Sequence, residues 1–314
     1  CFRSNPKTTE IRNHIAPIRS LANLPPLPYL FTPRNYVISK MKSRIVLVPV
    51  FTLASALLAA EWPQYRGPAQ DGKSPEKMGM WPWNGPTPLW KAPTPNGFSS
   101  FAVAGHRAFT LVSRQVDGVQ LEVLVALDTE SGKEVWSTPF APARYGHDGG
   151  NQGAGQNAGG DGPRSTPTVD GDRVYVLTSD LLLACFNTVN GSQVWKRDIL
   201  REHNGQNISW KNAASPLIQG DLVFVAGGGR GQAFLGINKN NGQPVWKGES
   251  DKMTHATPVP ATIHGTRQII FFTQEGLVAL KPDNGAVLWR HDHPFRTSTA
   301  ASPVIADDIV FCSA

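Results

Sequence analysis

From residue 98 onward, apolar and polar positions alternate, and a glycine turn interrupts this alternation repeatedly. Four segments share an apolar triplet, a polar stretch, a glycine four residues before a tryptophan, and the tryptophan itself. They are 125–136, 184–195, 235–246 and 278–289. Alternation is the period of a half-buried strand, and glycine adopts positive φ in a tight turn at little cost. Each segment is therefore predicted to fold as strand, turn, strand.

The four tryptophans of these segments are predicted to fix neighbouring sheets together. They are spaced 59, 51 and 43 residues apart along the chain. A tryptophan that recurs after a turn can bury a large apolar area against the next unit. The predicted docking residues are Trp136, Trp195, Trp246 and Trp289.

A second signature precedes the repeated segments. Ser or Ala, Ser or Thr, and then Pro occur at 165–167, 214–216, 256–258 and 301–303, and residues 98–103 carry a version without proline. Proline is tolerated at the first residue of a strand but not in the middle of a sheet, so it marks the start of the innermost strand. Four strands recurring at roughly 45-residue spacing are typical of a propeller blade. The predicted fold class is all-β, a β-propeller of four-stranded blades.

The blades are predicted near residues 98–138, 164–198, 212–248 and 254–291, with a fifth beginning at 299–314. Residues 61–97 are predicted to include a strand, around Trp90, that completes the last blade of a closed ring. A ring of seven or eight blades is expected, of which about four and a half are present, so we expect a C-terminally truncated propeller.

The positive charge of the chain is concentrated upstream of the repeats. The net charge is +6, yet residues 1–60 carry eight Lys and Arg against one acid, Glu10. Residues 61–314 are therefore close to neutral, and a nucleic-acid-binding role loses its support. We expect a monomer when the ring is complete.

The N-terminal sixty residues are predicted to be a leader. Residues 1–40 are interpreted as an upstream or disordered extension, and residues 41–60 as a signal peptide with a short basic start and an apolar stretch. The apolar stretch is shorter than the ~20 residues of a spanning helix. The prediction is a periplasmic or secreted protein without a membrane span after cleavage, and an uncleaved anchor is the alternative.

These residues resemble a known family. Residues 126–136 are similar to the tryptophan-docking repeat of PQQ-binding-like β-propeller proteins, in the quinoprotein alcohol dehydrogenase-like superfamily. Residues 62–68, together with Asp71-Gly72, resemble the mature N-terminus of exported members. The resemblance implies the fold and export. It leaves activity open, because such blades occur both in PQQ-dependent dehydrogenases and in non-enzymatic outer-membrane assembly proteins.

Dehydrogenases of this kind are expected to carry a vicinal cysteine pair, oxygen ligands for calcium and a catalytic aspartate. The three cysteines here, Cys1, Cys185 and Cys312, are far apart, and no Trp-Asp pair occurs. The sequence favours a non-enzymatic scaffold that binds a polar small molecule or another envelope protein. The alternative is a PQQ- and calcium-dependent alcohol or sugar dehydrogenase.

Candidate binding residues precede the inner strands, at one mouth of the predicted channel, where propellers bind ligands. The predicted residues are Arg164, Trp210, Lys211, Asn212, His255 and Arg296. A glycine-rich insertion at 145–163 adds the loop candidates His147, Asp148, Asn151 and Asp161. This insertion is either a ligand-binding loop or a linker between blades. No metal site is expected, and His291 and His293 are interpreted as parts of an exposed connection.

Overall fold

A computed structural model describes residues 61–77, 79–143, 145, 162–294 and 299–314. All described residues belong to one compact unit, Leu57–Ala314. The predicted extension at 1–40 and signal peptide at 41–60 lie outside the described residues. None of the helices in the described part is long and apolar enough to cross a membrane.

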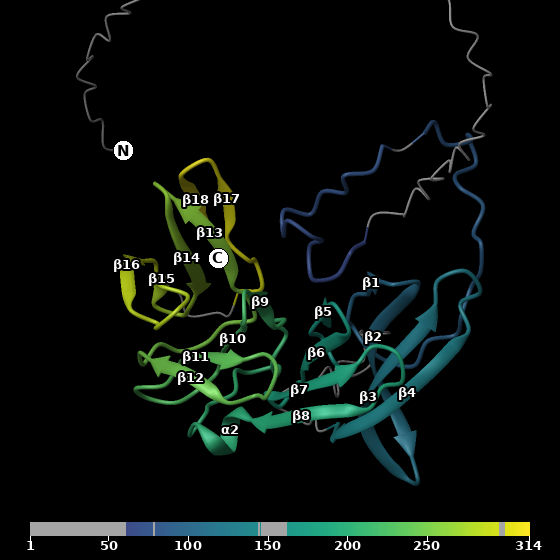
Figure 1. Cartoon of the computed structure of the whole chain (residues 1–314), viewed down its shortest axis with the longest axis horizontal. Helices are drawn as coiled ribbons and strands as arrows, with labels where there is room; N and C mark the ends of the chain where they lie inside the picture. Colours follow the sequence, from purple (N-terminus) through teal and green to yellow (C-terminus); the bar gives the residue numbers. More distant parts are fainter. Residues whose placement is uncertain (1–60, 78, 144, 146–161, 295–298) are drawn as a thin grey trace, which may run out of the picture. The chain divides into compact units, whose positions relative to one another are not determined.

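The described chain is built from antiparallel sheets whose strands follow one another in sequence order (Figure 1). Four sheets have four strands and a fifth has two, so the predicted all-β fold of four-stranded blades is confirmed. The first blade contains β1 (Ala102–Ala104), β2 (Arg107–Val116), β3 (Val119–Asp128) and β4 (Glu134–Pro142), and the second contains β5 (Thr168–Asp170), β6 (Arg173–Leu177), β7 (Leu182–Asn187) and β8 (Gln193–Asp198).

The third blade contains β9 (Leu217–Gln219), β10 (Leu222–Ala226), β11 (Phe234–Asn238) and β12 (Pro244–Gly248). The fourth contains β13 (Val259–Ile263), β14 (Thr266–Phe272), β15 (Gly276–Leu280) and β16 (Val287–Asp292), and the fifth sheet pairs β17 (Val304–Ala306) with β18 (Ile309–Phe311). A single helical turn, α2 (Ile199–Glu202), follows β8.

Tryptophans on the outer strands contact the next blade at its glycine turn. The indole N–H of Trp136 on β4 donates to the Thr188 carbonyl at 3.1 Å, and its ring lies against Gly191. A Cβ at Gly191 would lie 2.5 Å from that ring, and its φ is +71°. The glycine is therefore required both for the turn and for the close approach of the indole.

The same contact recurs at the following interfaces. The indole of Trp195 donates to Lys239 O at 2.8 Å, and that of Trp246 donates to Pro282 O at 2.7 Å. Trp289 holds the equivalent place on β16, but its indole donates to Gln268 Oε1 within the same blade. Trp90, which the sequence did not mark as a docking residue, donates to Thr129 O at 2.8 Å on the first blade.

The residues before the inner strands form a second contact between blades. The backbone N–H of Thr166 donates to Ser215 Oγ at 2.9 Å, that of Ser215 to Thr257 Oγ1 at 2.9 Å, and that of Thr257 to Ser302 Oγ at 3.1 Å. We call this series the hydroxyl belt. It explains why Ser or Thr precedes the proline, since each hydroxyl satisfies a backbone donor of the preceding blade.

The hydrophobic core lies between successive sheets. Separate clusters join the first blade to the second, the second to the third, and the third to the fourth. Phe109, Tyr175 and Phe224 are among their fully buried side chains. Cys185 is a free thiol in this core, and burial raises its pKa to about 12. The second and third sheets are thus packed on both of their flanks.

Candidate functional site

The predicted mouth residues lie on the connections that lead into the inner strands. Arg164 directly precedes the segment entering β5, Trp210 to Asn212 lie between α2 and β9, and His255 lies between β12 and β13. In an antiparallel blade, these connections and the turn between the second and third strands share one end of the sheet. Five predicted residues lie outside the described part, namely Arg296, His147, Asp148, Asn151 and Asp161.

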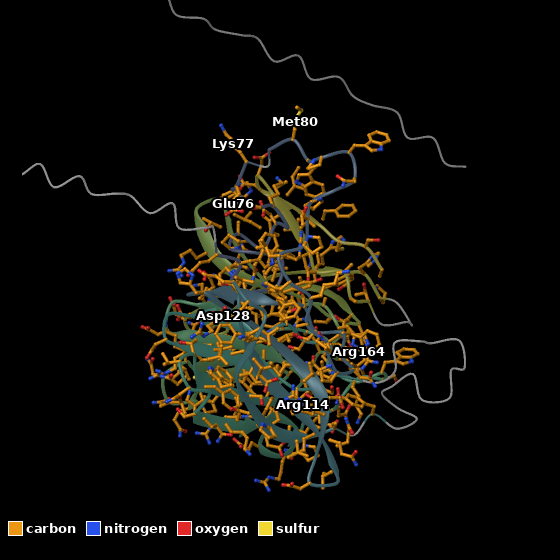
Figure 2. The ribbon with its side chains drawn as sticks, turned by 90° about the vertical axis from the view of Figure 1, so that its right-hand side faces the viewer. Glu76, Lys77, Met80, Arg114, Asp128 and Arg164 are labelled. Atoms are coloured by element: carbon orange, nitrogen blue, oxygen red, sulfur yellow. The ribbon has the colours of Figure 1, made fainter. Side chains whose placement is uncertain are left out.

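Arg164, labelled in Figure 2, is held next to the aromatic ring of Phe98. Its guanidinium carbon lies 5.2 Å from the centre of the Phe98 ring, and its Nη1 donates to Gly162 O at 3.3 Å. A guanidinium within ~6 Å of a ring centre is attracted by the ring's negative face. Phe98 occupies the same position before β1 that Arg164 occupies before β5, so two blades contribute to this contact.

His255 lies half-buried between several connections. Its backbone N–H donates to Thr299 O at 2.9 Å, at the entrance to the fifth sheet. Burial, and after it the positive charge of Arg164, lower the pKa of His255 below its usual value, while the backbones of Ser209 and Lys211 partly offset this effect. The imidazole is therefore neutral at pH 7 and offers one donor and one acceptor.

Trp210 and Lys211 form a turn with an unusual backbone. Both residues have φ of +64°, which is uncommon for residues other than glycine. The turn is fixed by a salt bridge of 2.8 Å between Lys211 Nζ and Asp180 Oδ1, and by a bond of 3.1 Å from Lys211 N to Ile208 O. The Trp210 side chain is 51% exposed. The protein thus presents an indole to solvent from a rigid turn.

Asn212, the residue that follows this turn, anchors it to the buried part of the fold through its side-chain amide. Its side chain is fully buried, and its amide nitrogen donates to Thr178 O at 3.3 Å and to Ala214 O at 3.0 Å. Its Oδ1 accepts the backbone N–H of Ala214 at 3.0 Å. Both ends of the amide are therefore engaged within the fold.

The structure brings Arg164, Trp210, Lys211 and His255 to one region, which we call the mouth cluster. Arg164 is close enough for its positive charge to act on the His255 imidazole. The same imidazole also interacts with the backbone of Lys211. The sequence did not identify Phe98 or Asp180 as members of this region. Their pairing becomes visible only when the connections of different blades are packed together.

A buried carboxylate between the first two blades was also missed. Glu122 on β3 is buried, and its Oε1 accepts from Tyr145 Oη at 3.1 Å and from Ser179 N at 3.3 Å. No ion pair to Glu122 occurs among the described residues. Burial raises its pKa to about 7. The sequence feature that points to this buried carboxylate is a single glutamate within the otherwise apolar residues 121–127.

We tested whether the described mouth residues fit PQQ with calcium. Calcium requires about six to eight oxygen ligands, mostly from carboxylates and carbonyls. The carboxylate of Asp180 is bonded to Lys211 and Asn207, and that of Glu122 is bonded to Tyr145 and Ser179. Across the described ranges, no three His, Cys, Asp or Glu side chains gather as a metal site, and His291 and His293 are exposed. The described part of the mouth does not supply a calcium ligand set.

Comparisons with known proteins identify relatives of this chain. The model of the family described as "Outer membrane protein assembly factor BamB" matches residues 84–204 and 120–314. BamB from Moraxella catarrhalis is similar in structure, with 15% identity, coverage of 64% of this chain and 53% of that one, and a TM-score of 0.43. No curated protein matches the chain.

Quinoprotein dehydrogenases are also among the similar structures. A quinohemoprotein alcohol dehydrogenase from Pseudomonas putida HK5 has 15% identity, coverage of 65% of this chain and 35% of its own, and a TM-score of 0.46. A europium-containing methanol dehydrogenase has 14% identity, coverage of 62% and 41%, and a TM-score of 0.43. This chain therefore spans about half the length of the BamB structure and less of the two dehydrogenases.

Proposed function

Because this chain belongs to the family of outer membrane protein assembly factor BamB, we propose that it is a non-catalytic scaffold of the cell envelope that binds a protein partner. The observation that carries the proposal is the exposed indole of Trp210 on a turn fixed by Lys211 and Asp180. The family description names the assembly of outer-membrane proteins, and the proposed partner acts in that process.

The residue types of the mouth cluster support a protein partner. Tryptophan and arginine are the residue types most enriched among those that dominate protein–protein binding energy. The turn that carries Trp210 is fixed before binding, so little backbone freedom is lost when a partner covers it. Arg164 adds a planar cation that is already stacked on Phe98.

Export to the periplasm is part of the proposal. It is supported by the signal-like segment at residues 41–60 and by the location implied in the family description. Mass spectrometry of the mature N-terminus in periplasmic extracts tests it, and a protein that retains residues 41–60 in the cytoplasm would contradict it.

The binding proposal is tested by photo-crosslinking in cells. A benzophenone amino acid replaces Trp210 in the full chain, and a matched variant carries it at Val189, which is 74% exposed on the opposite end of the second blade. We expect one discrete crosslinked envelope protein from position 210 and none from position 189. Equal crosslinking at both positions, or none at 210, would contradict the proposal.

The alternative of a PQQ-dependent dehydrogenase is tested separately. Purified protein is mixed with PQQ and calcium, and quinone absorbance and dye-linked oxidation of primary alcohols are measured. We expect neither a spectral change nor turnover, because the described mouth lacks a calcium ligand set. Stoichiometric quinone binding with alcohol oxidation would replace the scaffold proposal.

A further inference from the structure

Residues 61–72, which we call the inner-edge segment, run along the innermost strands of the first two blades. Trp62 pairs with Val103 of β1: Trp62 N donates to Val103 O at 2.9 Å, and Val103 N donates to Trp62 O at 2.8 Å. Val169 N on β5 then donates to Pro63 O at 2.7 Å. Both β1 and β5 are edge strands of their sheets. An edge strand offers unpaired N–H and C=O groups to an added strand, so this segment pairs with two successive blades by strand addition.

Side chains of the inner-edge segment extend these contacts to both ends of the described blades. The carboxylate of Glu61 accepts the backbone N–H of Gly105 at 3.0 Å, in the turn that follows β1. Arg66 Nη1 donates to Pro303 O at 3.4 Å, directly before β17 of the fifth sheet. Arg66 and Pro303 are 237 positions apart in the sequence. The segment therefore spans the space between the inner strands of the first blade and the entrance to the fifth sheet.

The inner-edge segment has a defined fold of its own after the paired residues. Gly67 N donates to Gln64 O at 3.0 Å, and Gly72 N donates to Arg66 O at 2.9 Å. Gly67 has φ of +79°, and a Cβ at this position would lie 2.7 Å from the Trp62 ring. The indole of Trp62 therefore packs on the turn that follows it, and glycine is required at position 67 for both the turn and this contact.

We infer that the inner edges of β1 and β5 form a binding site for an extended peptide, and that the inner-edge segment is its tethered occupant. Main-chain groups supply the paired hydrogen bonds, so another extended chain can form them only after this segment has left. The turn built on Trp62 and Gly67 gives the site its sequence preference. The inference goes beyond the proposed function and does not rest on it, since none of the contacts described above involves the mouth cluster.

Fluorescence anisotropy with a fluorescein-labelled peptide of residues 61–72 tests the site. The full chain from which only these residues are deleted should bind the peptide saturably. The wild type should bind it at least roughly tenfold more weakly, because a tethered segment competes at an effective concentration on the order of millimolar. A peptide with Gly67→Val should bind the deletion variant at least roughly tenfold more weakly than the native peptide. The matched peptide with Asp71→Asn should bind within about twofold, because the bonds of this exposed carboxylate go to Lys73.

Hydrogen exchange of the intact chain tests the occupant. The amides of Val103 and Val169 donate to the inner-edge segment, so their protection reports whether it is in place. In the full chain, Gly67→Val should speed their exchange at least roughly tenfold, while the amides between β2 and β3 stay protected. Gly72→Val is the matched control, because Gly72 also has a positive φ, +76°, but a Cβ there meets open space. It should change the exchange at Val103 and Val169 by less than about twofold.

Several results would overturn the inference. A deletion variant that is folded by circular dichroism but does not bind the peptide would reject the site, and equal binding to the wild type would place the peptide elsewhere. Unchanged exchange in Gly67→Val, or equal acceleration in both glycine variants, would reject the segment as occupant. If the deletion variant does not fold, the exchange experiment decides alone. Both experiments are independent of crosslinking at position 210, so their failure leaves the proposed function standing.

Discussion

The buried carboxylate of Glu122 makes the stability of this protein depend on pH in an unusual direction. Burial raises its pKa from 4.5 to about 7. Between these two values the unfolded chain has lost the proton and the folded chain retains it, so the free energy of unfolding falls as the pH rises. At ~1.4 kcal/mol per pKa unit, the full loss is about 3 kcal/mol and is complete above pH 7.

The substitution Glu122→Gln should remove this dependence. Glutamine keeps an oxygen that can accept from Tyr145 Oη and Ser179 N, which both bond to Oε1 in the wild type, and Ser179 N also bonds to Oε2 at 3.4 Å. Relative to the wild type, the variant should therefore gain about 3 kcal/mol of stability between pH 4.5 and pH 8, or roughly 6–12 °C in Tm for a domain of this size. Urea unfolding followed by tryptophan fluorescence at four pH values measures the difference.

A matched substitution in the same blade gives the opposite trend. A hydrogen bond from Arg114 is the main cause that lowers the pKa of Glu134 on β4. Its stabilisation is present above the unfolded pKa and is lost as the pH falls, so any difference between Glu134→Gln and the wild type should shrink toward low pH. If the Glu122→Gln and wild-type curves stay parallel within 1 kcal/mol from pH 5 to 8, the reasoning about burial is wrong.

Three further substitutions test the contacts between blades, each by urea unfolding of the full chain. Trp246→Ala removes a buried indole and its bond to Pro282 O, and should cost about 3–5 kcal/mol; a cost below 1 kcal/mol would show that the indole does not join the blades. Gly191→Ala should destabilise by more than ~1 kcal/mol, because the new Cβ meets the Trp136 ring at a positive φ, whereas Gly171→Ala has space and tests the effect of φ alone. Ser215→Ala leaves the buried N–H of Thr166 without its acceptor and should cost about 1–3 kcal/mol, and an unchanged stability would mean that the hydroxyl belt is not a stabilising contact.

Local patterns predicted the blades because the signals lie within one repeat. The glycine of each turn, the tryptophan four residues later and the proline at the inner strand reflect backbone constraints that neighbouring residues reveal. Trp90 shows the limit of this reasoning. It docks on the first blade as Trp136 docks on the second, yet it lies in no regular strand of the described chain, although the sequence predicts a strand around it.

The candidate site was only partly predictable, because its geometry arises from several blades at once. Sequence reasoning selected Lys211 and Asn212 by position alone. The structure pairs Lys211 with Asp180, and it buries Asn212 with both ends of its amide engaged. Arg164 lies against the Phe98 ring although the two residues are far apart in the sequence, and no local motif marks this contact.

The hydroxyl belt has a consequence for how such chains can change length. Each link runs in the same direction, from a main-chain donor of one blade to a Ser or Thr oxygen of the next. If one repeat were duplicated or deleted, the blades on either side of the joint would therefore still meet with a main-chain N–H on one and a Ser or Thr oxygen on the other. Whole repeats can be added or removed during evolution without any new chemistry at the joints.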